Sequence, residues 1–275
     1  MKKNILIDKY DILKKAIASY REVAIAFSAG VDSTFLLHTA KEVLGDKVLA
    51  ITAKSVLMPA LEEDEAEAYC QKNDIRQIVF TPDVFAVEGF ADNPPERCYL
   101  CKKQLFSQMK EIAENEGVRM LLDGSNSDDE GDFRPGMKAL EELKIHSPLR
   151  EFGFTKKEIR SLAHAIGLEV WDKPAYACLA TRVPYGEILD PSKLQLVEKA
   201  EAYLRSLGFV EVRVRVHNTV NARIELNPND FARFMRGDVR LEVNQRLKSM
   251  GFAYVSLDLQ GYRTGSLNEV LPESV

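Results

Sequence analysis

A short polar turn near the N-terminus carries residues suited to holding a phosphate group. Five apolar residues, 23–27, run directly into residues 28–34, which read SAGVDST and open an apolar helical pattern. A buried strand, a tight loop and a helix N-terminus in this order direct backbone N–H groups and the helix dipole at an anion. The hydroxyl groups of the turn add donors. The carboxylate of Asp32 suits such a site when Mg2+ lies between it and the phosphate oxygens.

The turn is not a Walker loop, because it lacks the terminal Gly-Lys-Ser/Thr. It resembles the PP-loop, Ser-Gly-Gly-x-Asp-Ser, of the ATP pyrophosphatases, which cleave ATP between the α and β phosphates and adenylylate an oxygen. Ala29 stands where that pattern has its first glycine. If the position requires a positive φ, alanine costs about 1 kcal/mol there. The alternative is a plain strand-to-helix turn with a serine cap.

Three of the four cysteines are placed where metal or redox chemistry can occur. Cys98 and Cys101 form a Cys-x2-Cys pair after two prolines, and we expect this pair to lie in a loop. Cys178 is a distant third thiol. Cys70 lies within a helical pattern and is expected to be structural.

The spacing of these thiols leaves several interpretations open. A closed zinc site requires four ligands, and the chain offers neither a second Cys-x2-Cys pair nor a histidine near the first. Half a zinc site, a redox dithiol, an iron–sulfur site and two coincidental loop cysteines are the candidates. Three thiolates on a [4Fe-4S] cluster would leave one iron able to hold an exogenous sulfide or a substrate atom.

The bulk composition excludes several classes of protein. The chain has 275 residues and is 45% hydrophobic, which suits two domains or one large α/β domain with an appendage. A net charge of −5 argues against a nucleic-acid partner. No segment approaches the length of a membrane helix, and the N-terminus lacks the apolar core of a signal peptide. We therefore expect a cytoplasmic protein without membrane contact, whose cysteines stay reduced.

Alternating strands and helices predict the fold class α/β, with a parallel sheet flanked by helices. The expected strands are 23–27, 47–53, 77–80 and 119–124, and the expected helices are 5–20, 35–44, 61–73, 105–116 and 155–166. The last helix begins with a capping box formed by Thr155 and Glu158. Ligands of such sheets bind beyond the carboxyl ends of the strands, where the Ser28 turn, Thr52 and Gly124 are expected to meet.

The pattern changes near residue 188, which predicts a PP-loop domain at 1–188 and a smaller α+β domain at 189–275. The second domain is expected to contain helices at 193–207, 231–235 and 239–250, and strands at 211–216, 222–226 and 253–257. We expect this domain to bind a substrate phosphate, to form oligomer contacts, or both.

Several segments together are similar to one family. They are residues 97–102 (RCYLCK), 123–129 (DGSNSDD), 134–136 (RPG), 147–149 (SPL), 173–186 (KPAYACLATRVPYG), 212–217 (VRVRVH) and 222–225 (ARIE). They resemble the ATP-dependent sulfurtransferases that make the nickel-pincer nucleotide, the lactate racemase cofactor. The resemblance covers nearly the whole chain, and the cysteine segments are more selective than the PP-loop, which many enzymes share.

The resemblance implies a two-step reaction. ATP adenylylates a carboxylate of pyridinium-3,5-biscarboxylic acid mononucleotide and releases pyrophosphate, and sulfur then displaces AMP to leave a thiocarboxylate. Some members sacrifice the sulfur of one cysteine, whereas others hold a [4Fe-4S] cluster on three cysteines and transfer a sulfide carried on its open iron. Cys98, Cys101 and Cys178 make this chain resemble the second kind. A sulfide donor and a closed homo-oligomer are implied as partners.

The resemblance also implies an ATP site built from small and hydroxyl-bearing residues. Pyrophosphate and Mg2+ would be held by Ser28, Gly30, Val31, Asp32 and Ser33. Adenosine would be lined by Ala26, Thr52, Ala53 and Gly124, because small residues at strand ends let a ligand approach. The alternative for this second set is packing at a crowded sheet edge. An acidic loop with Asp128, Asp129 and Asp132 could position a metal or be merely solvated.

Three arginines complete the expected site. Arg182 follows Cys178 by four residues and could hold the activated acyl phosphate beside the sulfur, or form only a surface ion pair. Arg213 and Arg215 alternate with valines, so both project from one face of a strand. Two guanidinium groups together suit the phosphate of a mononucleotide. The alternative is a solvated face paired with acidic residues of the neighbouring strand.

Three functions follow from this sequence, of which two are enzymes and the third belongs to a different class. The first is the sulfurtransferase, with Cys178, Asp32 and Arg182 as catalytic residues. The second is a tRNA thiolase of the PP-loop class with a three-cysteine cluster, against which the acidic charge argues. The third is a non-catalytic nucleotide-binding or metal-storage protein.

Overall fold

The chain forms two compact units. The computed structural model describes residues 2–131, 135–174, 177–218, 221–263 and 265–270. By its contacts, the first unit comprises residues 1–87 and 96–176, and the second comprises residues 88–95 and 177–275. The division after residue 176 lies before the boundary predicted near 188. An earlier segment joins the second unit because Asn93 donates hydrogen bonds to the carbonyls of Val183, at 3.1 Å, and Pro184, at 2.6 Å.

A four-stranded parallel sheet forms the centre of the first unit, with strand order β3-β2-β1-β4. The strands are β1 (Val23–Ala26), β2 (Val48–Ala53), β3 (Arg76–Phe80) and β4 (Leu121–Leu122). This confirms the predicted parallel sheet. β4 is shorter than the predicted strand 119–124, and just beyond it the Asp123 carboxylate accepts hydrogen bonds from Ser125 and Ser147.

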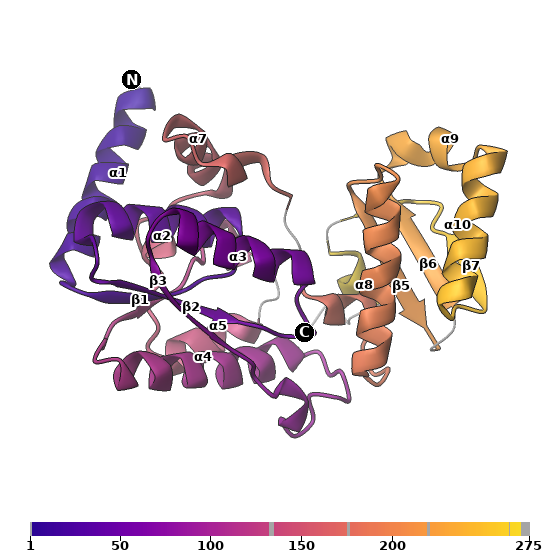
Figure 1. The fold of residues 1–275 in the computed structure, drawn as a ribbon, viewed down its shortest axis with the longest axis horizontal. Helices are drawn as coiled ribbons and strands as arrows, with labels where there is room; N and C mark the ends of the chain where they lie inside the picture. The colour runs from indigo at the N-terminus through magenta and orange to yellow at the C-terminus, as the bar shows by residue number, and fades with distance from the viewer. Residues whose placement is uncertain (1, 132–134, 175–176, 219–220, 264, 271–275) are drawn as a thin grey trace. The chain divides into compact units, whose positions relative to one another are not determined.

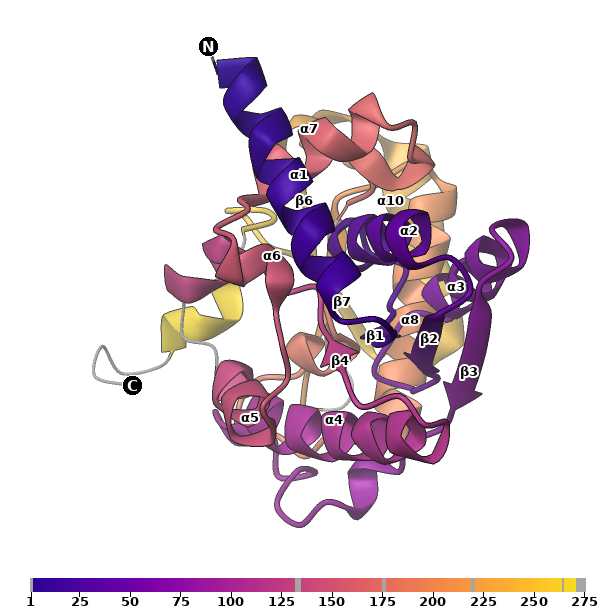
Figure 2. The same cartoon turned by 90° about the vertical axis from the view of Figure 1, so that its left-hand side faces the viewer.

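Helices cover both faces of this sheet (Figures 1 and 2). One face carries α1 (Lys2–Ser19), α2 (Val31–Leu44), α3 (Ala60–Lys72), α6 (Pro148–Glu151) and α7 (Lys156–Ala165), and the other carries α4 (Arg97–Asn115) and α5 (Pro135–Leu143). Two apolar cores result. Ile25 faces the core beneath α2, whereas its neighbour Ala24 faces the core beneath α4. Successive strand residues point to opposite faces, so a strand must be apolar throughout to serve both cores.

Two helix starts bear directly on the site. The predicted capping box of α7 is confirmed: the Thr155 hydroxyl accepts from the Glu158 N–H, and the Glu158 carboxylate accepts from the Thr155 N–H. The prediction that Cys98 and Cys101 lie in a loop is wrong. Helix α4 begins at Arg97, immediately after the segment with the two prolines, and both cysteines lie in its first turns. Proline cannot continue a preceding helix but readily precedes a new one, so the pair of prolines marked a helix start.

The second unit is a small α+β structure, as predicted. Its sheet has the order β5-β6-β7, with β5 (Val212–His217) antiparallel to β6 (Asn221–Leu226) and β7 (Tyr254–Leu257) parallel to β6. Its helices are α8 (Pro191–Ser206), α9 (Phe231–Phe234) and α10 (Gly237–Met250). Val197 of α8 and Val214 of β5 are fully buried, so this helix and strand share an apolar core.

Of the described helices, none combines the length and the apolar character needed to cross a bilayer.

Candidate active site

The predicted phosphate loop connects β1 to α2 at the carboxyl edge of the parallel sheet. Gly30 is the N-cap of α2, in an extended conformation with φ −73° and ψ 160°, and no side chain caps the helix among the described residues. The hydroxyl oxygens of Ser28 and Ser33 lie 3.2 Å apart across the loop, and the Ser33 hydroxyl donates to the Gly30 carbonyl at 3.2 Å. The alternative of a serine-capped turn is therefore wrong, and the positive end of α2 faces the loop without a capping side chain.

Ala29 adopts a left-handed backbone conformation, with φ +54°. The first glycine of the Ser-Gly-Gly-x-Asp-Ser pattern thus has a conformational reason at this position. Alanine is strained there by about 1 kcal/mol, as expected from the sequence. The carbonyl oxygen of Ala29 accepts a hydrogen bond from the Nζ of Lys173 at 3.0 Å.

Asp32, in the first turn of α2, is held by two neighbours. Its Oδ2 forms an ion pair with the Nζ of Lys156 and accepts a hydrogen bond from Asn126 at 3.3 Å. Its Oδ1 is buried and has no hydrogen-bond partner among the described residues. Burial raises the pKa of the Asp32 carboxyl, although the charge of Lys156 opposes that shift. A buried carboxylate oxygen with no protein partner is unusual, and its chemistry suits it to bind a divalent cation such as Mg2+.

The predicted adenosine-lining residues lie at the ends of three adjacent strands. Ala26 ends β1, Thr52 and Ala53 end β2, and Gly124 follows β4. The Thr52 hydroxyl donates to the carbonyl of Phe27 at 3.0 Å, so it anchors the strand that leads into the loop. The structure thus gathers these residues at the loop, and their contact with adenosine stays a prediction.

Gly124 packs directly against the start of α2. A Cβ atom added at Gly124 would lie 2.9 Å from the backbone nitrogen of Ser33 and 3.1 Å from its Cα. Only glycine allows this approach, because real Cβ atoms do not come that close to backbone atoms. The loop between β1 and α2 therefore depends on the residue that follows β4.

Two carboxylates of the acidic loop after β4 accept hydrogen bonds from backbone N–H groups. Asp128 Oδ2 accepts from the Lys156 N–H at 2.8 Å, and Asp129 Oδ2 accepts from the Asn126 N–H at 3.0 Å. These bonds hold Asn126 and the start of α7 near Asp32. Asp132 lies outside the described residues, as do Arg134, Ala175 and Tyr176 of the sequence motifs.

The cysteines differ sharply in burial. All four lie among the described residues, and none forms a disulfide. Cys70 is 1% exposed, and burial raises the pKa of its thiol to about 12, which fits the structural role predicted for it. Cys98, Cys101 and Cys178 are half-buried. Cys98 and Cys101 are three residues apart on α4 and so share one helix face.

Cys178 belongs to the second unit, whereas Cys98 and Cys101 belong to the first. Within the part of the chain that the structure describes, no group of three or more Cys, His, Asp or Glu side chains is arranged as a metal site. The predicted site of three converging thiols therefore stays a prediction.

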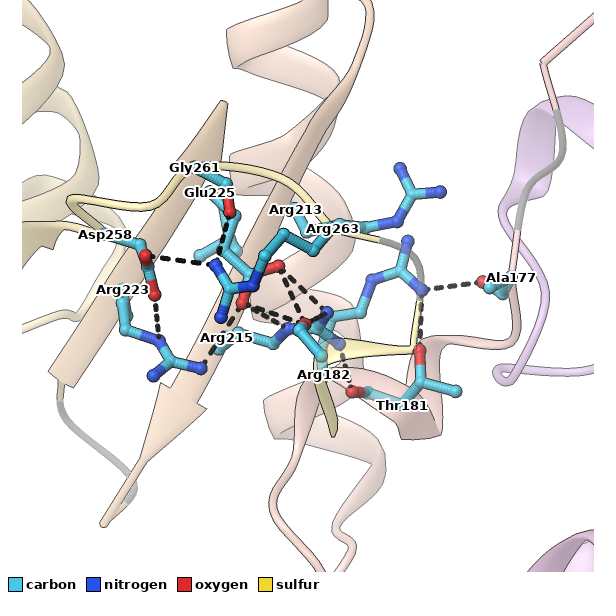
Figure 3. A network of polar contacts seen from close by, with 12 residues as sticks. Ala177, Thr181, Arg182, Arg213, Arg215, Arg223, Glu225, Asp258, Gly261 and Arg263 are labelled. Atoms are coloured by element: carbon cyan, nitrogen blue, oxygen red, sulfur yellow. Dashed lines mark hydrogen bonds and ion pairs between the residues drawn. The ribbon is translucent and has the colours of Figure 1, made fainter. Parts of the chain in front are cut away.

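Arg182 is completely buried in the second unit rather than exposed as a surface ion pair. Its Nε and one Nη donate to the two oxygens of Glu201 at 2.8 and 3.0 Å. Its other Nη donates to the carbonyls of Ala177 at 2.8 Å and Cys178 at 3.2 Å. Arg182 thus fixes the backbone that carries the Cys178 thiol, and Figure 3 shows its bond to the carbonyl of the preceding Ala177. Its predicted contact with the acyl phosphate stays a prediction.

Glu201 is the buried counter-ion of this arrangement. Burial works to raise the pKa of the Glu201 carboxyl, but the charge and hydrogen bonds of Arg182 outweigh it and hold that pKa below its ordinary value. Glu201 also accepts from the Val214 N–H at 3.0 Å. The ion pair therefore links α8, β5 and the Cys178 segment.

Arg213 and Arg215 lie on one face of β5, as predicted, but that face is buried rather than solvated: each residue is 6% exposed. Arg215 donates to both oxygens of Glu225 at 2.9 Å and to the Ser266 hydroxyl at 2.8 Å. The guanidinium of Arg213 lies 5.0 Å from the ring centre of Tyr262. Burial and the nearby charge of Arg182 lower the pKa of Arg213. A phosphate role for both arginines stays a prediction.

Comparisons with known proteins agree with this geometry. No protein-family model matches the chain. The pyridinium-3,5-bisthiocarboxylic acid mononucleotide synthase of Lactiplantibacillus plantarum is 40% identical over 270 residues, which cover 98% of this chain and 97% of the synthase. This chain belongs to that synthase family. The predicted family and the prediction of an ATP-dependent sulfurtransferase enzyme are confirmed, and the non-catalytic alternative is wrong.

Two further relatives extend the comparison. The Uncharacterized protein slr1717 of Synechocystis sp. is 41% identical over 268 residues, covering 97% of this chain and 99% of the relative. A glutamine-hydrolyzing GMP synthase chain of Methanococcus maripaludis is 31% identical over 209 residues, covering 68% of this chain and 64% of the relative. Together with the parallel sheet, this second relative identifies the synthase-family chain as a member of the PP-loop superfamily, as predicted.

Sequence reasoning missed two lysines that contact the loop. Lys156 is the first residue of α7 and pairs with Asp32, and Lys173 contacts the Ala29 carbonyl. A signal for Lys156 was present, because a lysine in the first turn of a helix opposes the helix dipole and so suggests another role. Lys173 had no comparable signal, since its partners on α3 are distant in the sequence.

Substituting Gly124 with alanine is expected to disturb the loop through backbone overlap with Ser33. The substitution should destabilise the first unit by about 1–3 kcal/mol and lower the rate of ATP use. Gly237→Ala is the matched control, because a Cβ there meets no atom within 4 Å and the backbone is helical. Chemical denaturation and pyrophosphate release would be measured on both variants. Equal behaviour of the two would contradict the packing argument.

The stability of the first unit is expected to depend on pH through Glu62 of α3. Burial raises the pKa of this carboxyl to about 7 from an ordinary value of 4.5, even though Lys173 lowers it. The folded state then binds the proton more tightly than the unfolded chain. Stability should therefore fall as the pH rises from 4.5 to 7 and level off above that, by about 3 kcal/mol in total.

Urea unfolding at several pH values tests this dependence. Glu62→Gln, which stays neutral, should flatten the profile between pH 5 and 7, whereas Glu67→Gln at an exposed position of the same helix should leave it unchanged. If Glu62→Gln shows the same dependence of the unfolding free energy on pH as the wild type, another group causes it.

Proposed function

We propose that this enzyme uses ATP to activate a carboxylate of pyridinium-3,5-biscarboxylic acid mononucleotide and then replaces the activating group by sulfur. In the first step a carboxylate oxygen attacks the α-phosphorus of ATP, and the bond to the β-phosphate oxygen breaks to release pyrophosphate. In the second step a sulfide attacks the acyl carbon, and AMP leaves with the bonding electrons. The product is a thiocarboxylate. The support from the structure is one arrangement: the uncapped start of α2 beside Asp32.

The loop supports the activation step by its charges. Backbone N–H groups of the loop and the dipole of α2 favour the pyrophosphate end of ATP. The residues proposed to contact it are Ser28, Gly30, Val31, Asp32 and Ser33. Lys156 forms an ion pair with Asp32 and adds its positive charge to that of the α2 dipole near the proposed pyrophosphate position. Ala26, Thr52, Ala53 and Gly124 are proposed to line the adenosine pocket at the strand ends.

The proposed Mg2+ fits the buried, unpartnered oxygen of Asp32. When bound, the ion would neutralise charge on the phosphates. The carboxylate of Asp32 is already oriented for this by Asn126 and Lys156, so the protein holds one ligand in place before the nucleotide arrives. This preparation reduces the reorganisation needed on binding.

The second unit is proposed to supply the sulfur site and the phosphate site of the mononucleotide. Arg182 and Glu201 hold the backbone of Cys178, so the thiol is presented from a fixed position. Arg213 and Arg215 carry the positive charge proposed for the substrate phosphate. A phosphate at this buried face would share Arg215 with Glu225, and few water molecules would screen its attraction to the guanidinium groups.

The three half-buried thiols of Cys98, Cys101 and Cys178 have the donor chemistry of an iron–sulfur ligand set. We propose that they hold a [4Fe-4S] cluster, which would supply an exchangeable sulfide. The thiols then survive each turnover, whereas a single sacrificed cysteine acts once. A cytoplasmic location, a sulfide donor and a homo-oligomeric assembly complete the proposal.

Two variants should separate activation from sulfur transfer. Asp32→Asn should reduce ATP-dependent pyrophosphate release by at least about 100-fold, since it removes the carboxylate charge proposed to bind Mg2+. Cys178→Ser should still release pyrophosphate but form no thiocarboxylate. Cys70→Ala, which removes a buried thiol away from the site, should retain both activities. Undiminished pyrophosphate release by Asp32→Asn would contradict the assigned role of the loop.

Anaerobic reconstitution tests the sulfur source. The wild-type protein should bind iron and sulfide and show broad visible absorption, and a variant with Cys98, Cys101 and Cys178 all replaced by alanine should show neither. Mass spectrometry after turnover should find Cys178 unchanged. Loss of one sulfur atom from Cys178 would instead establish the sacrificial route.

A further inference from the structure

Lys173 reaches from the end of the first unit into the phosphate loop. Its Nζ lies 3.0 Å from the carbonyl oxygen of Ala29. It also forms an ion pair with Glu65 and lies 3.8 Å from a carboxylate oxygen of Glu62, both on α3. The Lys173 side chain is 11% exposed, so these contacts are shielded from water. The ammonium group therefore joins α3 to the loop before α2.

The backbone of Lys173 is itself fixed. Its N–H donates to the carbonyl of Val170 at 3.1 Å, and its carbonyl accepts from Arg160 of α7 at 2.7 Å. Arg160 also donates to the carbonyl of Trp171 at 2.6 Å. The same helix α7 carries Lys156, which pairs with Asp32. These hydrogen bonds hold the backbone of Lys173, so its side chain contacts the loop from a fixed position.

The contact has a stereochemical consequence at Gly30. No peptide bond among the described residues is cis. In a trans peptide the C=O and N–H groups point in opposite directions. The carbonyl of Ala29 and the N–H of Gly30 belong to the same peptide, so a tether on that oxygen sets the direction of the Gly30 N–H. The Gly30 N–H then points away from Lys173.

The strained conformation of Ala29 has to be held by contacts from outside the loop. An alanine at φ +54° is strained, so the loop does not favour this conformation by itself. The charge-assisted hydrogen bond from Lys173 to the Ala29 carbonyl is one such contact, and it opposes rotation of the peptide between Ala29 and Gly30. Alanine thus stands where glycine would be unstrained, and a buried lysine holds the peptide that follows it.

We propose that Lys173 is a positioning residue of the ATP site, which acts by holding the peptide between Ala29 and Gly30 so that the Gly30 N–H faces the phosphates. This inference rests on the proposed function, because it takes the loop as the pyrophosphate site. Glu62 and Glu65 hold the ammonium group in place. Lys173 itself touches neither reactant.

The decisive variant is Lys173→Met, which keeps the length of the side chain but removes its charge. The double variant Lys173→Met with Glu62→Gln guards against misfolding. It leaves no buried Glu62 carboxylate without its positive partner. Lys72→Met is the matched control: Lys72 pairs with Glu169 at 2.8 Å, and the two side chains are 69% and 84% exposed. Lys173→Arg tests rescue by a conservative change.

Two readouts are needed. The first is steady-state pyrophosphate release at varied ATP and varied mononucleotide. Lys173→Met should lower kcat/KM for ATP by at least about 10-fold, the effect of losing a hydrogen bond to a charged group. The KM for the mononucleotide should stay within about twofold of wild type. The second is amide hydrogen exchange of residues 27–34, which should accelerate in Lys173→Met, recover in Lys173→Arg and stay unchanged in Lys72→Met.

The outcomes separate this inference from the proposed function. A wild-type enzyme that releases no pyrophosphate would overturn the proposed function, while hydrogen exchange would still report on the tether. If wild type releases pyrophosphate and Lys173→Met matches it in both readouts, the positioning role is wrong. Faster exchange with unchanged kinetics would also overturn it, because Lys173 would then be merely structural.

Discussion

The close approach of α2 to the end of β4 is the constraint on which the proposed ATP site depends. The backbone of Gly124 lies against Ser33, with no room for a side chain. This contact brings the start of α2 to the carboxyl edge of the sheet, where the helix dipole and the loop amides act together. The acidic loop after Gly124 then delivers Asn126 to Asp32 and supports the start of α7. The small size of Gly124 thus lets the end of β4, the start of α2 and the acidic loop lie close together.

Charge is arranged differently in the two units. Around the loop of the first unit, lysines from α7 and from its following segment stand beside Asp32, Glu62 and Glu65. In the second unit the pairs Arg182–Glu201 and Arg215–Glu225 are almost fully buried. Buried ion pairs rarely add much net stability, because desolvation opposes the attraction. Their value here is geometric: planar guanidinium groups fix the direction of the Cys178 segment and of β5.

The predicted phosphate loop, capping box, parallel sheet and α+β unit could all be derived from the sequence. Each depends on neighbours within a few residues, such as the run of apolar residues before Ser28 or the pair Thr155 and Glu158. The loop predicted for Cys98 and Cys101 is wrong for a local reason too, because the two prolines precede a helix instead of continuing a turn. The burial of Arg182, Arg213 and Arg215 had no local signal at all.

Residue order alone therefore predicted which chemistry the chain can perform: a phosphate loop with a carboxylate, three thiols suited to a cluster and paired arginines. Tertiary structure decided how those groups are held. Lys156 and Lys173 contact Asp32 and Ala29 from more than one hundred positions away, and Arg182 meets Glu201 because α8 packs against the segment that follows Cys178. Periodicity reports which face of an element is apolar, but it cannot report which distant charge that face will meet.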